Sequence, residues 1–380
     1  MSTTTLSAAP KASAPTAMTP FACTFTPNLP ELLQHLNCSI ALTTFQAGKV
    51  VMISPRNNEE LIQLPRTFHK AMGIAVQGDR MAVATKSEVV VLRNVPQLGQ
   101  SYPKRPQTYD NFWYPQATFY TGAVDIHDLH FGKKDIWAVN TSFSCLCTID
   151  SYHSFTPRWK PNFISKLASE DRCHLNGLAM ENGAPKYVSA LGTGDSFQSW
   201  RENITGGGAI IDVASNEIVA AELAMPHSPR LYNGKLYVLL SAAEQLICLD
   251  PQTGKYDVVA QLAGFVRGMD IIGEHLFIAT SKLRKNSSTF KHLKIADKAD
   301  KASVQVIHLP TGAKMAELHY TATVDEIYDV KILPNSQRPN IINTYTDAHH
   351  RGLVTPGGTF WAADIPEDLA ATAPKVIAEK

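Results

Sequence analysis

The feature that most constrains the fold of this chain is an internal repeat. Six segments can be superimposed, and each reads as a strand, a tight turn and a second strand; they begin at Met72, His127, Asn176, Ser228, Arg267 and Tyr328. Their starts lie 55, 49, 52, 39 and 61 residues apart, a spacing typical of the blades of a β-propeller with insertions. Short β-branched runs such as KLYVLLS dominate, and long helical periods do not occur. The repeat therefore predicts an all-β fold.

The two ends of the chain predict how the ring closes. The last repeat, 328–345, is followed by Gly, Pro and acidic residues, so it has no outer strands of its own. Residues 39–64 form a strand pair that has no inner partner. We expect these strands to share one blade, which gives a six-bladed β-propeller closed by pairing of N- and C-terminal strands and hides the sheet edges. A seventh blade within 93–122 is the alternative.

Composition divides the chain into one domain and two tails. Residues 1–25 are mostly Ser, Thr, Ala and Pro, which cannot offset the entropy of ordering, so a disordered tail is predicted there. Residues 26–365 are predicted as a single propeller domain, and 366–380 as a flexible tail. The stretch 93–122 carries seven aromatic side chains and is predicted to be an insertion that packs as a cap.

Charge and cysteine usage exclude several classes of protein. The 35 Lys and Arg nearly balance the 34 Asp and Glu, for a formal net charge of +1, so we expect no nucleic-acid partner. No apolar run is long enough to span a membrane and no secretory h-region is evident, so we expect a cytoplasmic protein without a membrane partner. Cys145 and Cys147 share one face of a predicted strand, which favours core packing over metal binding.

The repeat also indicates where a ligand would bind. The first strand of each propeller blade lines the central channel, and the residues at its start stand at the channel mouth. Three of the 13 histidines fall in this narrow band. Two residues before the starts of the six repeats stand Lys70, Asp125, His174, Pro226, Phe265 and Glu326.

These polar residues suggest two kinds of chemistry. Acid–base catalysis would use His127, His174, Glu326 and Tyr328. A divalent metal ion, as cofactor, would be bound by His127, His174, Asn176 and His227. The structural alternative for each single residue is a histidine satisfied at a strand end, or an Asn-Gly turn.

Cations near the same strand starts predict an anionic ligand. Arg172, Arg230 and Arg267 adjoin the channel strands, and Lys70 stands before the first of them. A guanidinium matches the geometry of a carboxylate or phosphate, so these four residues are the candidate substrate-binding groups for a small anionic molecule. The alternative is that the arginines connect neighbouring blades through carbonyls and carboxylates.

Several phrases carry a family resemblance: FSCLCTIDSYHSFTPRWKPNFIS, EDRCHLNGLAM, MPHSPRLYNGKLYVLLS, FVRGMD and EIYDVKILP. Through them the chain resembles an uncharacterised bacterial propeller family across about 40–350. More distantly, the NGLA motif at Asn176 and the six-blade count are similar to the gluconolactonase and regucalcin superfamily. That resemblance implies a divalent ion in the channel and opening of sugar lactones, and only Asn176 matches its ligands by motif.

Two functions remain open at this point. The first is an enzyme with lactonase-like or hydrolase-like activity that acts on a small anionic substrate at a His/Arg/Glu-lined mouth. The second is a non-catalytic propeller that binds a ligand or a protein partner. The substrate, the identity of the metal and the oligomeric state are not determined by the sequence.

Overall fold

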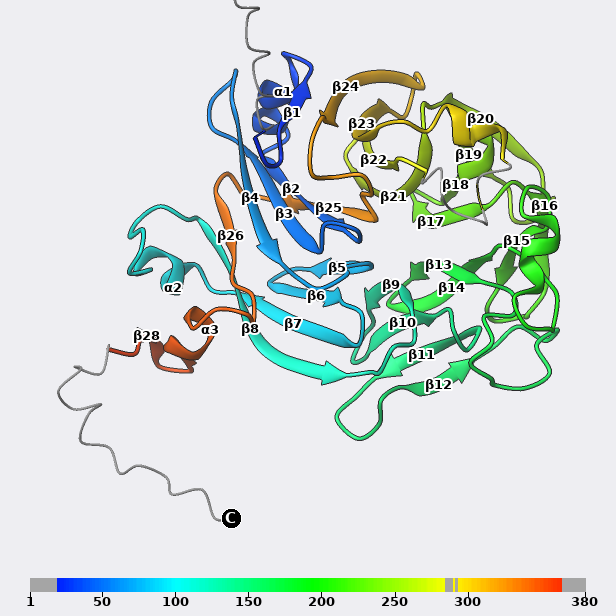
Figure 1. The fold of residues 1–380 in the computed structure, drawn as a ribbon, viewed down its shortest axis with the longest axis horizontal. Helices are drawn as coiled ribbons and strands as arrows, with labels where there is room; N and C mark the ends of the chain where they lie inside the picture. The colour runs from blue at the N-terminus through cyan, green and yellow to red at the C-terminus, as the bar shows by residue number, and fades with distance from the viewer. Residues whose placement is uncertain (1–18, 284–289, 291–292, 364–380) are drawn as a thin grey trace, which may run out of the picture.

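The computed structural model describes residues 19–283, 290 and 293–363. Its strands form six antiparallel four-stranded units arranged around a central axis, so the chain is a six-bladed β-propeller (Figure 1). The innermost strands β5, β9, β13, β17, β21 and β25 surround the channel (Figure 1). The fold class predicted from the repeat is confirmed.

The blades follow the chain in order, apart from the first. Blade 1 contains β25 (Asp329–Pro334), β2 (Cys38–Thr44), β3 (Lys49–Pro55) and β4 (Leu61–Thr67). Blade 2 contains β5 (Ile74–Gln77), β6 (Arg80–Ala84), β7 (Glu88–Asn94) and β8 (Asn111–Tyr120). Blade 3 contains β9 (Ile126–Phe131), β10 (Ile136–Asn140), β11 (Cys145–Ile149) and β12 (Thr156–Trp159).

The second half of the ring repeats this order. Blade 4 contains β13 (Leu175–Glu181), β14 (Ala184–Ala190), β15 (Gly208–Asp212) and β16 (Ile218–Leu223). Blade 5 contains β17 (Pro226–Tyr232), β18 (Lys235–Leu240), β19 (Gln245–Leu249) and β20 (Tyr256–Gln261). Blade 6 contains β21 (Phe265–Ile272), β22 (His275–Ser281), β23 (Ala302–His308) and β24 (Ala313–Tyr320).

The ring closes in blade 1, where the two ends of the propeller meet. β25 pairs antiparallel with β2 from Thr43↔Asp329 to Cys38↔Pro334, as the unpaired terminal strands predicted. The second half of the last repeat behaves differently from the prediction of a hairpin. β26 (Pro339–Ile341) does not return along β25, because β2 already occupies that edge; it pairs in parallel with the start of β8.

The segment 93–122 belongs to blade 2, and its prediction as an inserted cap was wrong for residues 111–120, whereas the connection before them packs in an aromatic-rich cluster. Residues 111–120 form β8, the outermost strand of that blade, which pairs with β7. Only the connection to it, with α2 (Pro96–Gln100), stands outside the blade. Phe112, Trp113 and Tyr114 are buried, so their aromatic side chains anchor a strand.

The described part of the N-terminal region is ordered, contrary to the prediction for residues 1–25. β1 (Cys23–Phe25) pairs with β24 at the outer edge of blade 6, and α1 (Leu29–His35) follows it. Phe21, Cys23 and Phe25 pack against an apolar cluster that includes Leu318 and Tyr320. The alternation of these three apolar side chains is the sequence signal for a strand that the prediction overlooked. Residues 1–18, like the predicted tail 366–380, lie outside the described residues.

Deleting residues 1–25 is expected to lower the melting temperature by several degrees relative to deleting residues 1–18. The longer deletion removes β1 and exposes the edge of β24 together with the apolar side chains beneath it. Thermal unfolding of the two truncated proteins side by side measures the difference. Equal melting temperatures would show that β1 contributes nothing to stability.

The core lies between the blades. Within the described residues, six apolar clusters each join two neighbouring blades. Cys145 and Cys147 face blade 2 in one cluster, and Leu146 faces blade 4 in the next. Because the apolar side chains pack between neighbouring blades, the starts of the inner strands can carry polar residues that face the channel. After Ile341 the chain adds α3 (Ala348–Arg351) and the hairpin β27 (Gly352–Thr355) and β28 (Gly358–Trp361).

Candidate functional site

A small cavity lies where five inner strands begin. Two residues from each of blades 3, 4, 5, 6 and 1 line it: His127, Asp128, Asn176, Gly177, His227, Ser228, Arg267, Gly268, Tyr328 and Asp329. About 10 Å³ is available there to the centre of a water molecule, which is room for about one water. The structure thus brings five of the six repeat starts to one place; Met72, the sixth, does not line the cavity.

Two of the imidazoles at the cavity have a defined tautomer. Nδ1 of His127 lies 3.0 Å from the carbonyl oxygen of Asp125, and Nδ1 of His227 lies 2.9 Å from that of Met225. A carbonyl oxygen only accepts, so Nδ1 carries the hydrogen in both rings and Nε2 is left as an acceptor. Asp125 and Met225 have φ values of 56° and 58°, a local backbone strain that turns each carbonyl toward the ring two residues later.

Both of these histidines are neutral at physiological pH. Burial and, after it, the neighbouring His174 together lower the pKa of His127 to about 4. Burial also holds the pKa of His227 well below its ordinary value, and the charge of Arg267 acts in the same direction. The channel mouth therefore presents hydrogen-bond acceptors on these rings rather than positive charge.

His174 is fixed by residues that sequence analysis did not select. Its Nδ1 lies 3.0 Å from both carboxylate oxygens of Asp171, and the indole Nε1 of Trp200 donates to the same carboxylate at 3.0 Å. The Trp200 ring lies against His174 at 4.3 Å between centroids, and the His127 ring lies edge-on at 4.8 Å. His174 does not itself line the cavity but is one ring away from it.

Arg267 differs from the other arginines near the channel. Its guanidinium lies over the rings of Tyr328, at 4.8 Å, and Phe265, at 5.1 Å. Within the described residues no carboxylate pairs with it, and its buried Nε has no hydrogen-bond partner. Burial raises the pKa of Tyr328 well above its ordinary value, so its hydroxyl remains a donor next to an unpaired positive charge.

The two carboxylates that line the cavity, Asp128 and Asp329, are each paired with a cation. Arg230 donates to Asp128 at 2.9 Å, and Lys331 lies 3.2 Å from Asp329. Burial alone would raise the pKa of the Asp128 carboxyl, but the Arg230 guanidinium and then His130 hold it well below its usual range. Burial raises the pKa of Asp329. Asp128 and Asp329 thus already have cationic partners, and neither forms an ion pair with Arg267.

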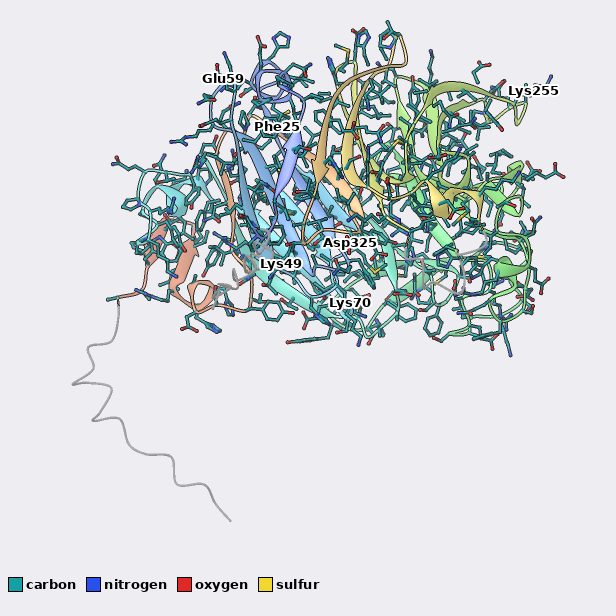
Figure 2. The ribbon with its side chains drawn as sticks, turned by 45° about the horizontal axis from the view of Figure 1, so that its top comes forward. Phe25, Lys49, Glu59, Lys70, Lys255 and Asp325 are labelled. Carbon is teal, nitrogen blue, oxygen red and sulfur yellow. The ribbon has the colours of Figure 1, made fainter. Side chains whose placement is uncertain are left out.

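Four of the predicted site residues lie elsewhere. Arg172 pairs with Glu170 at 2.8 Å and Asp195 at 2.6 Å, and Arg230 is held behind the cavity by Asp128, so both guanidiniums connect structural elements. Lys70 lies over the Phe45 ring at 5.2 Å on the mouth face, toward the lower side of Figure 2. Glu326 forms a backbone bridge with Ser281 and does not line the cavity. The geometry gives these four residues no contact with the cavity.

The lining of the cavity gives little support for a divalent-cation site. Among the described residues, no group of three or more His, Cys, Asp or Glu side chains is arranged to hold a metal ion. Arg267 would add a positive charge beside any such ion. The metal role of His127, His174, Asn176 and His227 stays a prediction, and no chemical step is derived from it.

A larger cavity lies at the other end of the channel. Its volume is about 540 Å³, and its lining includes Asp79, Asp270 and Trp113. Asp79 pairs with Arg93 at 2.8 Å, and Asp270 accepts backbone hydrogen bonds from Ile271 and Ile332. The charged side chains of this larger cavity already have partners, whereas the small cavity contains Arg267, which has no carboxylate partner among the described residues.

Comparison with known protein families shows which family the chain belongs to. Residues 27–342 match a family described as a domain of unknown function, DUF4915. The chain belongs to this uncharacterised family. No curated protein matches it. Among solved structures, a chain of a nidogen/laminin complex is 12% identical, with 78% of this chain and 99% of that chain covered and a TM-score of 0.49. No helix among the described residues is long and apolar enough to cross a membrane.

Proposed function

We propose that the channel mouth binds a small organic anion and that Arg267 is the residue that recognises its charge. The observation that carries this proposal is the unpaired guanidinium, held in place by Tyr328 and Phe265. Arg267 is half-buried and its Nε is buried without a hydrogen-bond partner, so a carboxylate or phosphate group of a ligand would supply the partner that this guanidinium lacks.

The other groups at the cavity narrow the class of ligand. The Tyr328 hydroxyl and the Asn176 amide can donate to an anionic oxygen, whereas Nε2 of His127 and of His227 can only accept. A ligand that matches them carries an anionic group and an O–H or N–H donor, as a hydroxycarboxylate does. Because the cavity has room for about one water, only the polar group of the ligand enters it.

Small carboxylates should raise the melting temperature of the protein in a manner that depends on Arg267. Lactate, malate and succinate are expected to stabilise the wild-type chain at millimolar concentration, since a ligand that binds only the folded state shifts unfolding. Succinamide, which is neutral, should not. Arg267→Gln should abolish the stabilisation, and added NaCl should weaken it. Thermal-shift measurements followed by calorimetry test this.

Arg93→Gln is the matched control, because Arg93 is an exposed arginine that pairs with Asp79 far from the channel mouth. It should leave the shift unchanged. If the neutral diamide stabilises the protein as well as the diacids do, or if Arg267→Gln binds them normally, the proposed function is wrong. Binding alone would fit either an enzyme or a non-catalytic propeller, and the next experiment separates the two.

A further inference from the structure

We propose that Asp171 and His174 activate a water molecule at the channel mouth, next to the cavity in which Arg267 holds the anionic group, and that the substrate is an ester that carries a carboxylate. This proposal rests on the anion-binding function proposed above. It assigns a catalytic role to His174 and a positioning role to Asp171 and Trp200, neither of which was selected from the sequence.

The first argument is the way His174 is held. The Asp171 carboxylate accepts from Nδ1, so Nδ1 carries the hydrogen and Nε2 is the basic nitrogen of this ring. A carboxylate in this position orients the ring and stabilises the imidazolium formed when Nε2 takes a proton. Asp171 and His174 both have left-handed φ values, 47° and 48°. Strain of this kind at two non-glycine residues is typical of functional sites.

The second argument is the continuity between this pair and the cavity. The His174 ring contacts the His127 ring at 4.8 Å, the His127 ring contacts Tyr328 at 5.6 Å, and Tyr328 contacts Arg267 at 4.8 Å. An acceptor, a hydroxyl donor and a cation therefore line a space for about one water, and the His174 base stands one ring away from it, against His127. Such a set combines proton transfer with recognition of an anion.

The third argument concerns the nucleophile. Ser228 is the serine that lines the cavity, and its Oγ accepts a hydrogen bond from the amide of Gly268 at 3.0 Å. Among the described residues, no imidazole is hydrogen-bonded to that oxygen, so no base is placed to activate it. A water molecule activated by His174 is therefore the nucleophile that the geometry supports.

The step balances without a co-reactant. Water transfers a proton to Nε2 of His174 while its oxygen forms a bond to the ester carbonyl carbon, and the Tyr328 hydroxyl donates to the carbonyl oxygen as negative charge develops. When the carbon–oxygen bond to the alcohol breaks, the proton on His174 moves to the leaving alkoxide. The products are a carboxylate and an alcohol, and the acid formed releases one proton to solvent.

The test uses mono-4-nitrophenyl glutarate, an anionic ester, and 4-nitrophenyl pentanoate, its neutral counterpart. We expect the wild-type chain to hydrolyse the anionic ester well above the buffer rate and to prefer it to the neutral one, with 4-nitrophenolate release as the readout. Asp171→Asn and His174→Gln should each lower kcat by about 100-fold or more while KM changes little. Arg267→Gln should raise KM. A merely structural role for Asp171 would not separate kcat from KM in this way.

The chain offers a second Asp–His pair as a control. Asp150 lies 3.4 Å from Nδ1 of His153 on an exposed turn of blade 3, so Asp150→Asn should leave kcat unchanged. If Asp171→Asn does not fold, Trp200→Phe keeps an aromatic ring against His174, removes only the indole donor to Asp171, and should lower kcat about 10-fold.

The outcomes separate this inference from the proposed function. Carboxylates that stabilise the protein through Arg267, without hydrolysis of either ester, overturn the hydrolytic centre and leave anion binding intact. Hydrolysis that survives both Asp171→Asn and His174→Gln also overturns it. If no carboxylate stabilises the protein, the proposed function fails and this inference fails with it.

Discussion

Replacing Arg230 with methionine is expected to lower the free energy of unfolding by about 3–5 kcal/mol, because it leaves the buried Asp128 carboxylate without its main counter-charge. Arg230 belongs to blade 5 and Asp128 to blade 3, and their side chains are 10% and 5% exposed. Arg230 also donates to the carbonyl of Leu178 in blade 4 at 3.0 Å, and Asp128 accepts from the amide of the same residue. One ion pair therefore joins three blades at the channel.

Chemical denaturation of Arg230→Met measures this loss, and two further variants define its cause. Asp128→Asn combined with Arg230→Met should recover much of the stability, because the amide oxygen still accepts from Leu178 and no charge is left buried. Arg93→Met breaks the exposed pair with Asp79, where both side chains are more than half exposed, and should cost less than about 1 kcal/mol. A similar small loss for Arg230→Met would mean that the channel is hydrated and the pair contributes little.

Gly268→Ala is expected to lower the free energy of unfolding by about 2–4 kcal/mol, from a strained backbone and a direct clash. Gly268 has a φ of +69°, and a Cβ added there would lie 2.6 Å from Cα of Asp329 and 2.8 Å from the carbonyl oxygen of Tyr328. Both are backbone atoms of the closing strand, so neither moves cheaply. The substitution also displaces Tyr328 from Arg267, so anion binding should fall with stability.

Gly273→Ala isolates the backbone contribution to that loss. Gly273 lies in the turn between β21 and β22 with a φ of +56°, and a Cβ there would meet no atom within 4 Å. It should cost about 1–2 kcal/mol from φ alone, and the excess for Gly268→Ala is the cost of the close approach between blades 6 and 1. Equal unfolding free energies for the two variants would exclude a tight contact at the closing strand.

The parts of the fold that were predicted correctly depend on local patterns. Alternating apolar residues and turn signals recur with each blade, so the repeat gave the blade count and the unpaired strands at the two ends gave the closure. The errors lie where tertiary pairing decides. β8 was missed because its aromatic run resembles a packed cap, and β1 was missed because three residues of strand become stable only against β24.

The candidate site was likewise predicted in part from local patterns and in part depends on tertiary contacts. Alignment of the repeats placed His127, Asn176, Ser228, Arg267 and Tyr328 at equivalent positions, and the structure brings all five to one cavity; their functional roles remain predictions. Sequence treated Arg172, Arg230 and Arg267 alike. Their different surroundings separate them, because the first two have carboxylate partners from other segments and Arg267 has aromatic neighbours. A single sequence contains no signal for such pairing.

The sequence by itself determined the number of blades, the closing pair of strands and most of the positions that face the channel, since each repeat and each unpaired terminal strand is recognised from residues close together in the chain. Only the tertiary structure decided which charges are neutralised. Asp128 meets Arg230 across 102 positions of chain, and Asp171 meets Trp200 across 29. These contacts depend on how the blades are arranged around the ring, and an ion pair fixes the state of a buried group only once both partners are in place. That Arg267 has no carboxylate partner among the described residues is therefore seen in the folded protein and not in the sequence.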